Sequence, residues 1–317
     1  MADIPVLVAG DTVVDAYPEG RLALGGDAVA LHPGGSGANA AVGLARLFGA
    51  PHFHTVLAGD RLAAELAANF RRAGVGDDLF RRVDGETPVA FLDRPEGDLA
   101  WTVYHRPATL ALDADLVPDA VLSSVSAVHL SAITLGHERG RAATVELARR
   151  ARERGATVAV DCNGRANMWD GPAGFRDALG ELLSRADVAF ASAGDLAVAG
   201  VEGDRDRLLS FLHDRGVERA FLTRGADGAV ASDGARTVAH AGYEVDAVNP
   251  AGAGDAFAAG VVGALAASDG ETLSDLLAVG NAAGALATTG DDPTAPLSPD
   301  RLRALAGEAV PAGVLDS

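Results

Sequence analysis

Short apolar segments alternate with longer amphipathic segments along most of this 317-residue chain. The apolar segments are typical of buried strands and lie at 5–9, 52–57, 88–92, 100–104, 126–130, 156–160, 187–191, 219–223 and 228–232. The amphipathic segments predict helices at 37–48, 60–73, 138–154, 172–184, 204–215, 254–267 and 272–288. This alternation predicts an α/β fold in which a mostly parallel sheet is flanked by helices on both faces.

Two segments interrupt the alternation, because residues 12–31 and 82–105 have strand-like patterns without intervening helices. No Ser/Gly-rich linker or internal repeat divides the chain, and only residues 291–300, with three prolines, look like a long loop. We therefore expect residues 1–317 to form a single α/β domain to which the two interrupting segments add a small β structure.

The run from Asn249 to Phe257 predicts an anion-binding helix start. Its small residues, Ala251 to Gly254, allow a ligand to approach the backbone, and the following apolar segment looks helical. The free N–H groups of residues 252–255 would then lie at the positive end of a helix dipole, where a phosphate binds. A carboxylate in this place, Asp255, suggests a proton acceptor beside a transferring phosphoryl group. The alternative is a carboxylate that only caps the helix.

A second small-residue run, from His32 to Leu47, opens another helix with two glycines, Gly34 and Gly35. It carries Asn39, whose amide both donates and accepts hydrogen bonds and therefore suits a polyhydroxylated ligand. The spacing of glycines resembles the dinucleotide-binding fingerprint, but no acidic residue closes a βαβ unit at the expected distance, so we set a dehydrogenase aside.

Read together, the two runs resemble the ribokinase-like (PfkB) family of ATP-dependent carbohydrate kinases, and the resemblance extends over nearly the whole chain. The blocks that carry it, in the order of the family, are Gly10–Asp15, Gly34–Asn39, Asp161–Arg165, Thr223–Gly228 and Gly252–Phe257. The resemblance implies a ribokinase-like fold with a small β lid over the ligand, formed by about 12–31 and 82–105, and a homodimer that associates through this lid.

The resemblance also assigns roles to residues. Asp255 matches the catalytic base, and the backbone N–H groups of Gly252, Ala253 and Gly254 would stabilise charge on the transferring phosphoryl group. Asp15 matches an aspartate that binds sugar hydroxyls, although a turn or capping role is the alternative. The further residues expected at the substrate are Gly34, Gly35 and Asn39, and those expected at the nucleotide are Thr223, Gly225, Gly228 and Asn281.

The middle of the chain resembles the 2-keto-3-deoxygluconate kinase branch of the family, which shares a sequence block with the fructokinases. Tyr104 and Arg106 match a Tyr-x-Arg motif of that branch, and Arg165 matches an arginine in a later block. Two guanidinium groups would pair with the carboxylate of a sugar acid, so we expect 2-keto-3-deoxygluconate as substrate. The alternatives are fructose, ribose or a nucleoside, surface ion-pair roles for the arginines, and a catalytically idle relative that senses sugars or nucleotides.

Three positions depart from the family pattern. Asn249 replaces an aspartate that helps to form a monovalent-cation site, which weakens the expectation of potassium activation. Asp195 replaces a glutamate that organises magnesium through water, and it can still orient a hydrated Mg²⁺ ion. Ala132 replaces a glycine and narrows the expected pocket. The expected cofactors are therefore ATP and Mg²⁺.

Charge and composition restrict the remaining possibilities. All 26 basic residues are arginine, and 44 acidic residues give a net charge of −18, so nucleic acid is an improbable partner. Without lysine, a Walker-A motif or a Schiff base cannot form. The acidic composition suggests adaptation to a high-salt cytoplasm, and a GC-rich coding bias is the alternative explanation of this composition. We expect neither a signal peptide nor a membrane span, and the lone cysteine, Cys162, makes a cytoplasmic location the default.

Overall fold

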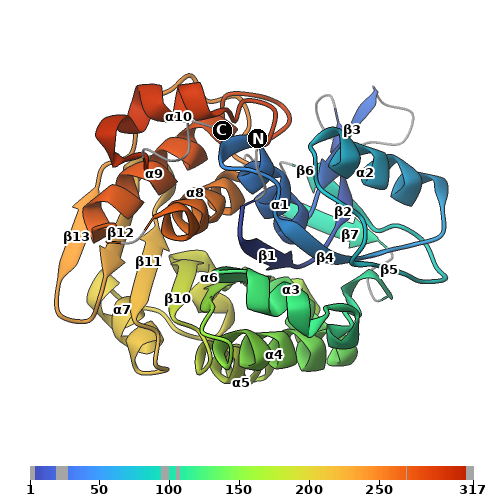
Figure 1. Cartoon of the computed structure of the whole chain (residues 1–317), viewed down its shortest axis with the longest axis horizontal. Helices are drawn as coiled ribbons and strands as arrows, with labels where there is room; N and C mark the ends of the chain where they lie inside the picture. The colour runs from blue at the N-terminus through green and yellow to red at the C-terminus, as the bar shows by residue number, and fades with distance from the viewer. Residues whose placement is uncertain (1–3, 19–27, 94–99, 105–107, 269, 312–317) are drawn as a thin grey trace.

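The computed structural model describes residues 4–18, 28–93, 100–104, 108–268 and 270–311. In this part of the chain a large central sheet runs through the molecule (Figure 1). Its strands, in spatial order, are β13 (Thr237–His240), β12 (Ala229–Ser232), β11 (Arg219–Thr223), β10 (Val188–Ser192), β9 (Thr157–Asp161), β8 (Ala127–Ser131), β1 (Val6–Ala9), β4 (His52–Leu57) and β5 (Phe80–Arg82).

The sheet is parallel from β5 to β11, and only β12 and β13 pair antiparallel at one edge. In β1, Val6 and Val8 join one apolar core, whereas Leu7 and Ala9 join the core on the opposite face. A strand buried on both faces is typical of a parallel sheet between two helical layers, so the predicted fold class is confirmed.

Helices cover both faces of the sheet (Figure 1). One layer contains α1 (Ser36–Leu47), α2 (Arg61–Arg72), α8 (Ala253–Ala267), α9 (Leu273–Ala287) and α10 (Pro299–Ala306). The other layer contains α3 (Asp119–Ser124), α4 (Glu138–Arg152), α5 (Pro172–Leu183), α6 (Ala193–Val198) and α7 (Arg205–His213).

Two glycines bring the start of α1 against the end of β1. A Cβ atom on Gly37 would lie 2.5 Å from the Cα of Gly10, so neither position tolerates a side chain without a shift of backbone. Gly35, the N-cap of α1, has a φ of 101°, which other residues rarely adopt. The helix therefore begins directly above the carboxyl ends of the central strands, where open α/β sheets bind ligands.

A second, smaller sheet stands at one side of the central sheet (Figure 1). Its strands, in spatial order, are β3 (Val29–Gly34), β2 (Val13–Pro18), β6 (Val89–Asp93) and β7 (Ala100–Tyr104). The pair β2–β6 is parallel, and the two outer pairs are antiparallel. These strands come from the two segments that interrupt the helix–strand alternation, and β3 continues to Gly34, three residues beyond the predicted segment.

Five short elements escape the sequence analysis, namely β5, β13, α3, α6 and α10. β5 has only 3 residues and β13 has 4, too few for a period to be recognised. Within the predicted loop at 291–300, Ser298 accepts a hydrogen bond from the Arg301 N–H, and Pro299 takes the first helical position of α10. None of the described helices is long and apolar enough to span a bilayer.

Candidate active site

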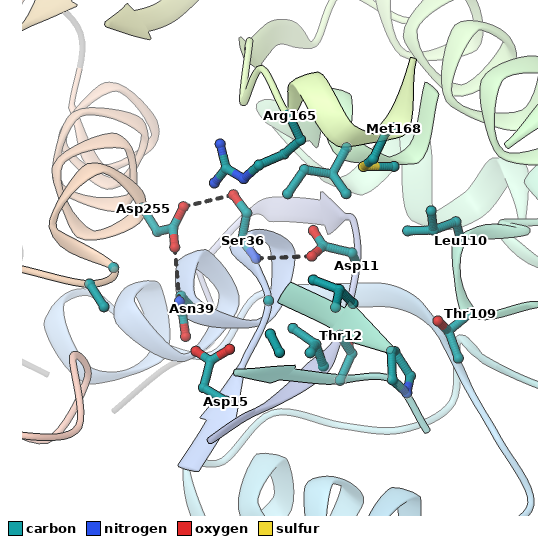
Figure 2. Close-up of a pocket in the computed structure, with 18 of the residues that line it drawn as sticks. Asp11, Thr12, Asp15, Ser36, Asn39, Thr109, Leu110, Arg165, Met168 and Asp255 are labelled. Atoms are coloured by element: carbon teal, nitrogen blue, oxygen red, sulfur yellow. Dashed lines mark hydrogen bonds between the residues drawn. The ribbon is translucent and has the colours of Figure 1, made fainter. Parts of the chain in front are cut away.

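A cavity of about 310 Å³ lies where the central strands, the starts of α1 and α8 and the small sheet meet (Figure 2). Carboxylates gather at one end of it, and mostly apolar side chains form the other. The lining residues used below are Asp11, Val13, Asp15, Gly35, Ser36, Asn39, Pro88, Ala90, Val103, Leu110, Ile133, Arg165, Met168, Gly252 and Asp255.

Asp255 lies in the first turn of α8, and both of its carboxylate oxygens are held by side chains of α1 (Figure 2). The Ser36 hydroxyl donates to Oδ1 over 2.7 Å, and the Asn39 amide donates to Oδ2 over 2.8 Å. Because each carboxylate oxygen has two lone pairs, both can still accept a proton or a hydrogen bond from a ligand in the cavity.

Burial raises the pKa of Asp255 to about 6, and the hydrogen bonds from Asn39 and Ser36 oppose this shift. Nearby Asp11 raises the pKa further, whereas the Arg165 guanidinium lowers it. A carboxylate with a pKa of this size is ionised at neutral pH and is a better proton acceptor than an ordinary aspartate.

The backbone before Asp255 forms an anion cradle. Gly252, the N-cap of α8, has a φ of 73° in the left-handed region. Among the described residues, the N–H groups of Gly252, Gly254 and Asp255 have no hydrogen-bond acceptor, whereas that of Ala253 is bonded to the Pro250 carbonyl. A Cβ atom on Gly254 would meet no neighbouring atom within 4 Å, so the space beside this residue is open. These groups fit a phosphate at a helix N-terminus.

Asp15 comes from β2 of the small sheet and is only 6% exposed. A Cβ atom on Gly34, in the neighbouring strand β3, would lie 2.2 Å from the Asp15 carboxylate. Gly34 therefore leaves room for Asp15. Burial, together with the charges of Asp255 and Asp11, raises the pKa of Asp15 to about 7.

Asp11 follows β1 and ties that strand to α1. Its carboxylate accepts hydrogen bonds of 3.2 Å from the N–H groups of Ser36 and Gly37, and of 3.3 Å from the Ser131 hydroxyl. Burial raises its pKa, and the backbone donors oppose the shift. Asp11 thus satisfies the otherwise free N-terminal groups of α1 and fixes the helix that holds Asp255.

Arg165 lies beside Ser36 and Asp255 at the edge of the cavity (Figure 2). Its guanidinium donates to the carbonyl of Gly164 and is 3.7 Å from a carboxylate oxygen of Asp195. Asp195 in turn caps α6, accepting hydrogen bonds from Ser192 and from the N–H of Gly164. The described residues contain no group of three or more His, Cys, Asp or Glu side chains that could hold a metal ion.

The residues predicted for the nucleotide lie apart from the cavity lining. Thr223 ends β11, and Gly225 begins the 3₁₀ helix η6 (Gly225–Asp227) with a φ of 60°. Gly228 is required by backbone packing, because a Cβ atom there would lie 2.1 Å from the His240 carbonyl oxygen. Asn281, on α9, is buried and donates to the Leu277 carbonyl. Their role in nucleotide binding stays a prediction.

Apolar side chains form the wall opposite the carboxylates. They come from the small sheet, from the segment after it and from the loops that follow β8 and β9, and they are Val13, Pro88, Ala90, Val103, Leu110, Ile133 and Met168. Tyr104 ends β7 beside this wall, where its backbone pairs with Val89. Arg106 lies outside the described residues.

Three residues that contribute to the site have no predicted role, namely Asp11, Ser36 and Asn163. All three lie within the blocks that carry the family resemblance. Their position directly after β1, at the start of α1 and directly after β9 places them at the ligand-binding edge of the sheet. Polar residues close to the end of a predicted strand or the start of a predicted helix are thus the sequence signal that identifies them.

The sheet order, the two helical layers and a carboxylate beside an anion cradle define an α/β phosphotransferase. The family model for pfkB family carbohydrate kinases matches residues 5–301, and the chain belongs to this family. It is an ATP-dependent sugar kinase, as the sequence analysis predicts.

Several relatives with different substrates are similarly close. The chain is 31% identical to an aminoimidazole riboside kinase of Salmonella typhimurium, over 90% of this chain and 89% of the relative. It is 30% identical to a 2-dehydro-3-deoxygalactonokinase of Haloferax volcanii, over 92% and 93% of the two chains. The structure of a Xylella fastidiosa fructokinase with bound ATP superimposes with a TM-score of 0.85 and 25% identity, over 95% and 97% of the chains.

Proposed function

We propose that this kinase phosphorylates a hydroxyl of a 2-keto-3-deoxy sugar acid of the 2-keto-3-deoxygluconate type, with Asp255 as the catalytic base. The observation that carries the catalytic part is the position of Asp255, which lies in the same helical turn as the free N–H groups of the anion cradle and lines the cavity. A base this close to a phosphate site suits the transfer of a phosphoryl group from ATP to a sugar hydroxyl.

In the proposed reaction, the substrate hydroxyl gives its proton to Asp255 as its oxygen bonds to the γ-phosphorus of ATP. The bond between that phosphorus and the β,γ-bridging oxygen breaks, and ADP leaves with the bond's electron pair. The N–H groups of Gly252, Gly254 and Asp255 stabilise the charge on the phosphoryl oxygens during transfer. Arg165 adds a positive charge at the same end of the cavity.

Substrate orientation follows from the charge distribution in the cavity. Asp15 and Asn39 offer acceptors and a donor to sugar hydroxyls at the end that contains Asp255. A sugar carboxylate would be repelled by Asp15 and Asp255 and would pair with the guanidinium groups of Arg165 and Arg106. The Haloferax relative, whose name denotes a 2-dehydro-3-deoxy sugar acid as substrate, supports this class.

A neutral substrate is the second candidate, and the apolar wall favours it. Pro88, Val103, Leu110, Ile133 and Met168 offer no partner to a charged group and suit the flat ring of a riboside or the carbon face of fructose. The similarity to the aminoimidazole riboside kinase and to the fructokinase supports this alternative.

Mg²⁺ is the proposed metal, and it would accompany ATP as the counter-charge of the phosphates. Mg²⁺ keeps several water ligands and needs only one or two carboxylates from the protein. Asp195 would hold the hydrated ion through water, because its own oxygens already accept hydrogen bonds from Ser192 and Gly164. The side-chain oxygen of Asn249 accepts from the Ala251 N–H, and its amide nitrogen donates to the Asp291 carbonyl, so we propose no potassium requirement.

The small sheet is the proposed lid and the proposed surface of a homodimer. Val29 and Leu31, on its edge strand β3, are 39% and 55% exposed, which is unusual for large apolar side chains in a strand. The acidic surface fits a cytoplasm of high salt, where the net charge of −18 is screened.

An ADP-release assay over a panel of sugars tests the substrate. The panel contains 2-keto-3-deoxygluconate, 2-keto-3-deoxygalactonate, fructose, ribose and a purine and an imidazole riboside, each with MgATP in molar KCl. We expect the highest kcat/KM with a 2-keto-3-deoxy sugar acid. Efficient turnover of a neutral sugar or riboside, together with inert sugar acids, would establish the second candidate instead.

A further inference from the structure

Asn163 has an uncommon backbone conformation directly beside the site. It follows β9, and with a φ of 40° it is the only non-glycine residue of positive φ in the described part of the chain. Asparagine tolerates the left-handed region better than most residues but still adopts it at some cost. The side chain is only 6% exposed, so the fold retains a buried amide in a costly conformation.

The hydrogen bonds of Asn163 fix the orientation of its amide. Its Nδ2 donates to the Oγ of Ser36 over 2.9 Å, and its Oδ1 accepts from Arg165 over 3.4 Å. A guanidinium group can only donate, so the amide oxygen must face Arg165 and the amide nitrogen must face Ser36.

This orientation determines where the Ser36 hydroxyl points. Since the Ser36 oxygen accepts from Asn163, its own hydrogen is free to be donated to Asp255, whose Oδ1 lies 2.7 Å away (Figure 2). Asn39 holds the other carboxylate oxygen. The chain Arg165, Asn163, Ser36 and Asp255 is thus a directed series of hydrogen bonds from the edge of the cavity to the carboxylate.

We propose that Ser36 and Asn163 are positioning residues, in which Asn163 orients the Ser36 hydroxyl and that hydroxyl holds the Asp255 carboxylate toward the substrate. The inference rests on the proposed role of Asp255 as the base. Neither residue contacts the transferring group in this scheme, and each acts through the next.

The hydroxyl also stabilises the ionised form of the base. Burial raises the pKa of Asp255, whereas the donated hydrogen bonds of Asn39 and Ser36 lower it. Removal of one charge-assisted hydrogen bond should raise this pKa by about one unit. A purely structural role for Ser36 would change stability and leave the titration of Asp255 where it is.

The experiment compares Ser36→Ala and Asn163→Gly with the wild type. Glycine at 163 adopts the observed φ freely, so this variant removes the amide without disturbing the backbone. Ser232→Ala is the matched control, because Ser232 in β12 is a similarly buried hydroxyl that is hydrogen-bonded to His213 and lies outside the cavity lining. Two measurements are made on each variant: the pH dependence of kcat, and the titration of Asp255 by ¹³C NMR of aspartate-labelled protein, with the resonance assigned by its loss in Asp255→Asn.

We expect Ser36→Ala to shift both the NMR titration and the acidic limb of the kcat profile upward by about one unit. Asn163→Gly should shift both in the same direction by less, because the freed hydroxyl can still rotate toward Asp255. Asp255 in Ser232→Ala should titrate as in the wild type. Coincident Asp255 titrations in Ser36→Ala and the wild type would overturn the inference. Turnover retained in Asp255→Asn would instead overturn the role of the base, and the NMR titration would still decide whether Ser36 holds the carboxylate.

Discussion

The amide nitrogen of Asn39, in α1, donates a 2.8 Å hydrogen bond to a carboxylate oxygen of Asp255, in α8, across 216 positions of the sequence. The N-terminal turns of two helices therefore meet over one carboxylate. Both helix dipoles present their positive ends to it, which favours the ionised form needed to accept a proton. The contact also explains why the two small-residue runs must occur together in this chain.

Replacement of the base tests this arrangement directly. Asp255→Asn keeps a carbonyl oxygen that can accept from Asn39 or Ser36, so we expect a folded protein. Loss of a general base costs about 10² to 10⁴ in rate. We therefore expect kcat to fall by that factor while the Kd for ATP, measured by calorimetry, changes little. A variant with half of the wild-type kcat would contradict the assignment.

Activity should also depend on pH through this group. The pKa of Asp255 is raised to about 6, and only the ionised form accepts a proton. We expect kcat/KM to fall about tenfold per pH unit below that value and to level off above it. The profile is measured under saturating MgATP, and a flat profile down to pH 5 would exclude a base with this pKa.

Asp15 should lower stability at neutral and alkaline pH. Its folded-state pKa of about 7 lies above the value of 3.8 for an exposed aspartate, so the native state becomes less stable as pH rises toward and through 7. Asp15→Asn removes this effect and should increase the free energy of unfolding at pH 8 by about 1–4 kcal/mol. The same variant should raise KM for the sugar.

Urea unfolding at pH 8 and at pH 4.5 measures the difference in unfolding free energy between Asp15→Asn and the wild type. This difference should be smaller at pH 4.5, because the Asp15 carboxyl of the folded wild type is then protonated. Asp170→Asn, an exposed aspartate outside the cavity, is the control and should leave the unfolding free energy unchanged. A destabilised Asp15→Asn protein at pH 8 would mean that the ionised carboxylate is compensated by its surroundings.

If the substrate is a sugar acid, loss of Arg165 or Arg106 should affect its turnover more than the turnover of a neutral sugar. A charge-assisted hydrogen bond is worth about 1.5–3 kcal/mol, or roughly ten- to a hundredfold in kcat/KM. Arg165→Ala and Arg106→Ala should each reduce kcat/KM by that factor for the sugar acid and much less for a weakly accepted neutral sugar. Lysine should rescue only in part because it lacks the planar fork. Arg139→Ala, which breaks an ion pair with Asp113 away from the cavity, is the control.

High salt should stabilise the protein if the acidic surface is an adaptation. With a net charge of −18, repulsion between carboxylates opposes the folded state, and added ions screen it. We expect Tm to rise steeply with KCl up to molar concentration. Sorbitol at matched osmolality is the control for general solute effects, and an unchanged Tm in KCl would favour coding bias as the origin of the composition.

Much of the fold follows from local patterns in the sequence. The central strands and the long helices can be predicted because burial on a parallel sheet and amphipathic helix packing leave periodic apolar patterns in a single stretch of chain. Asp255 can be predicted for a similar reason, since a helix start made of small residues is a local feature. The very short strands β5 and β13 leave no such pattern, because their pairing partners define them.

The sequence by itself determined the α/β architecture, the anion cradle and the place of Asp255 in the first turn of its helix, because each depends on neighbouring residues. Only the tertiary structure decided how the Asp255 carboxylate is held. Ser36 and Asn39 donate to Asp255, and Asn163 donates to Ser36, in contacts between residues distant in sequence. The same holds for Gly34, which is a glycine because the Asp15 carboxylate of the adjacent strand occupies the space of a side chain. Such constraints arise only when strands and helices pack, and no local pattern records them.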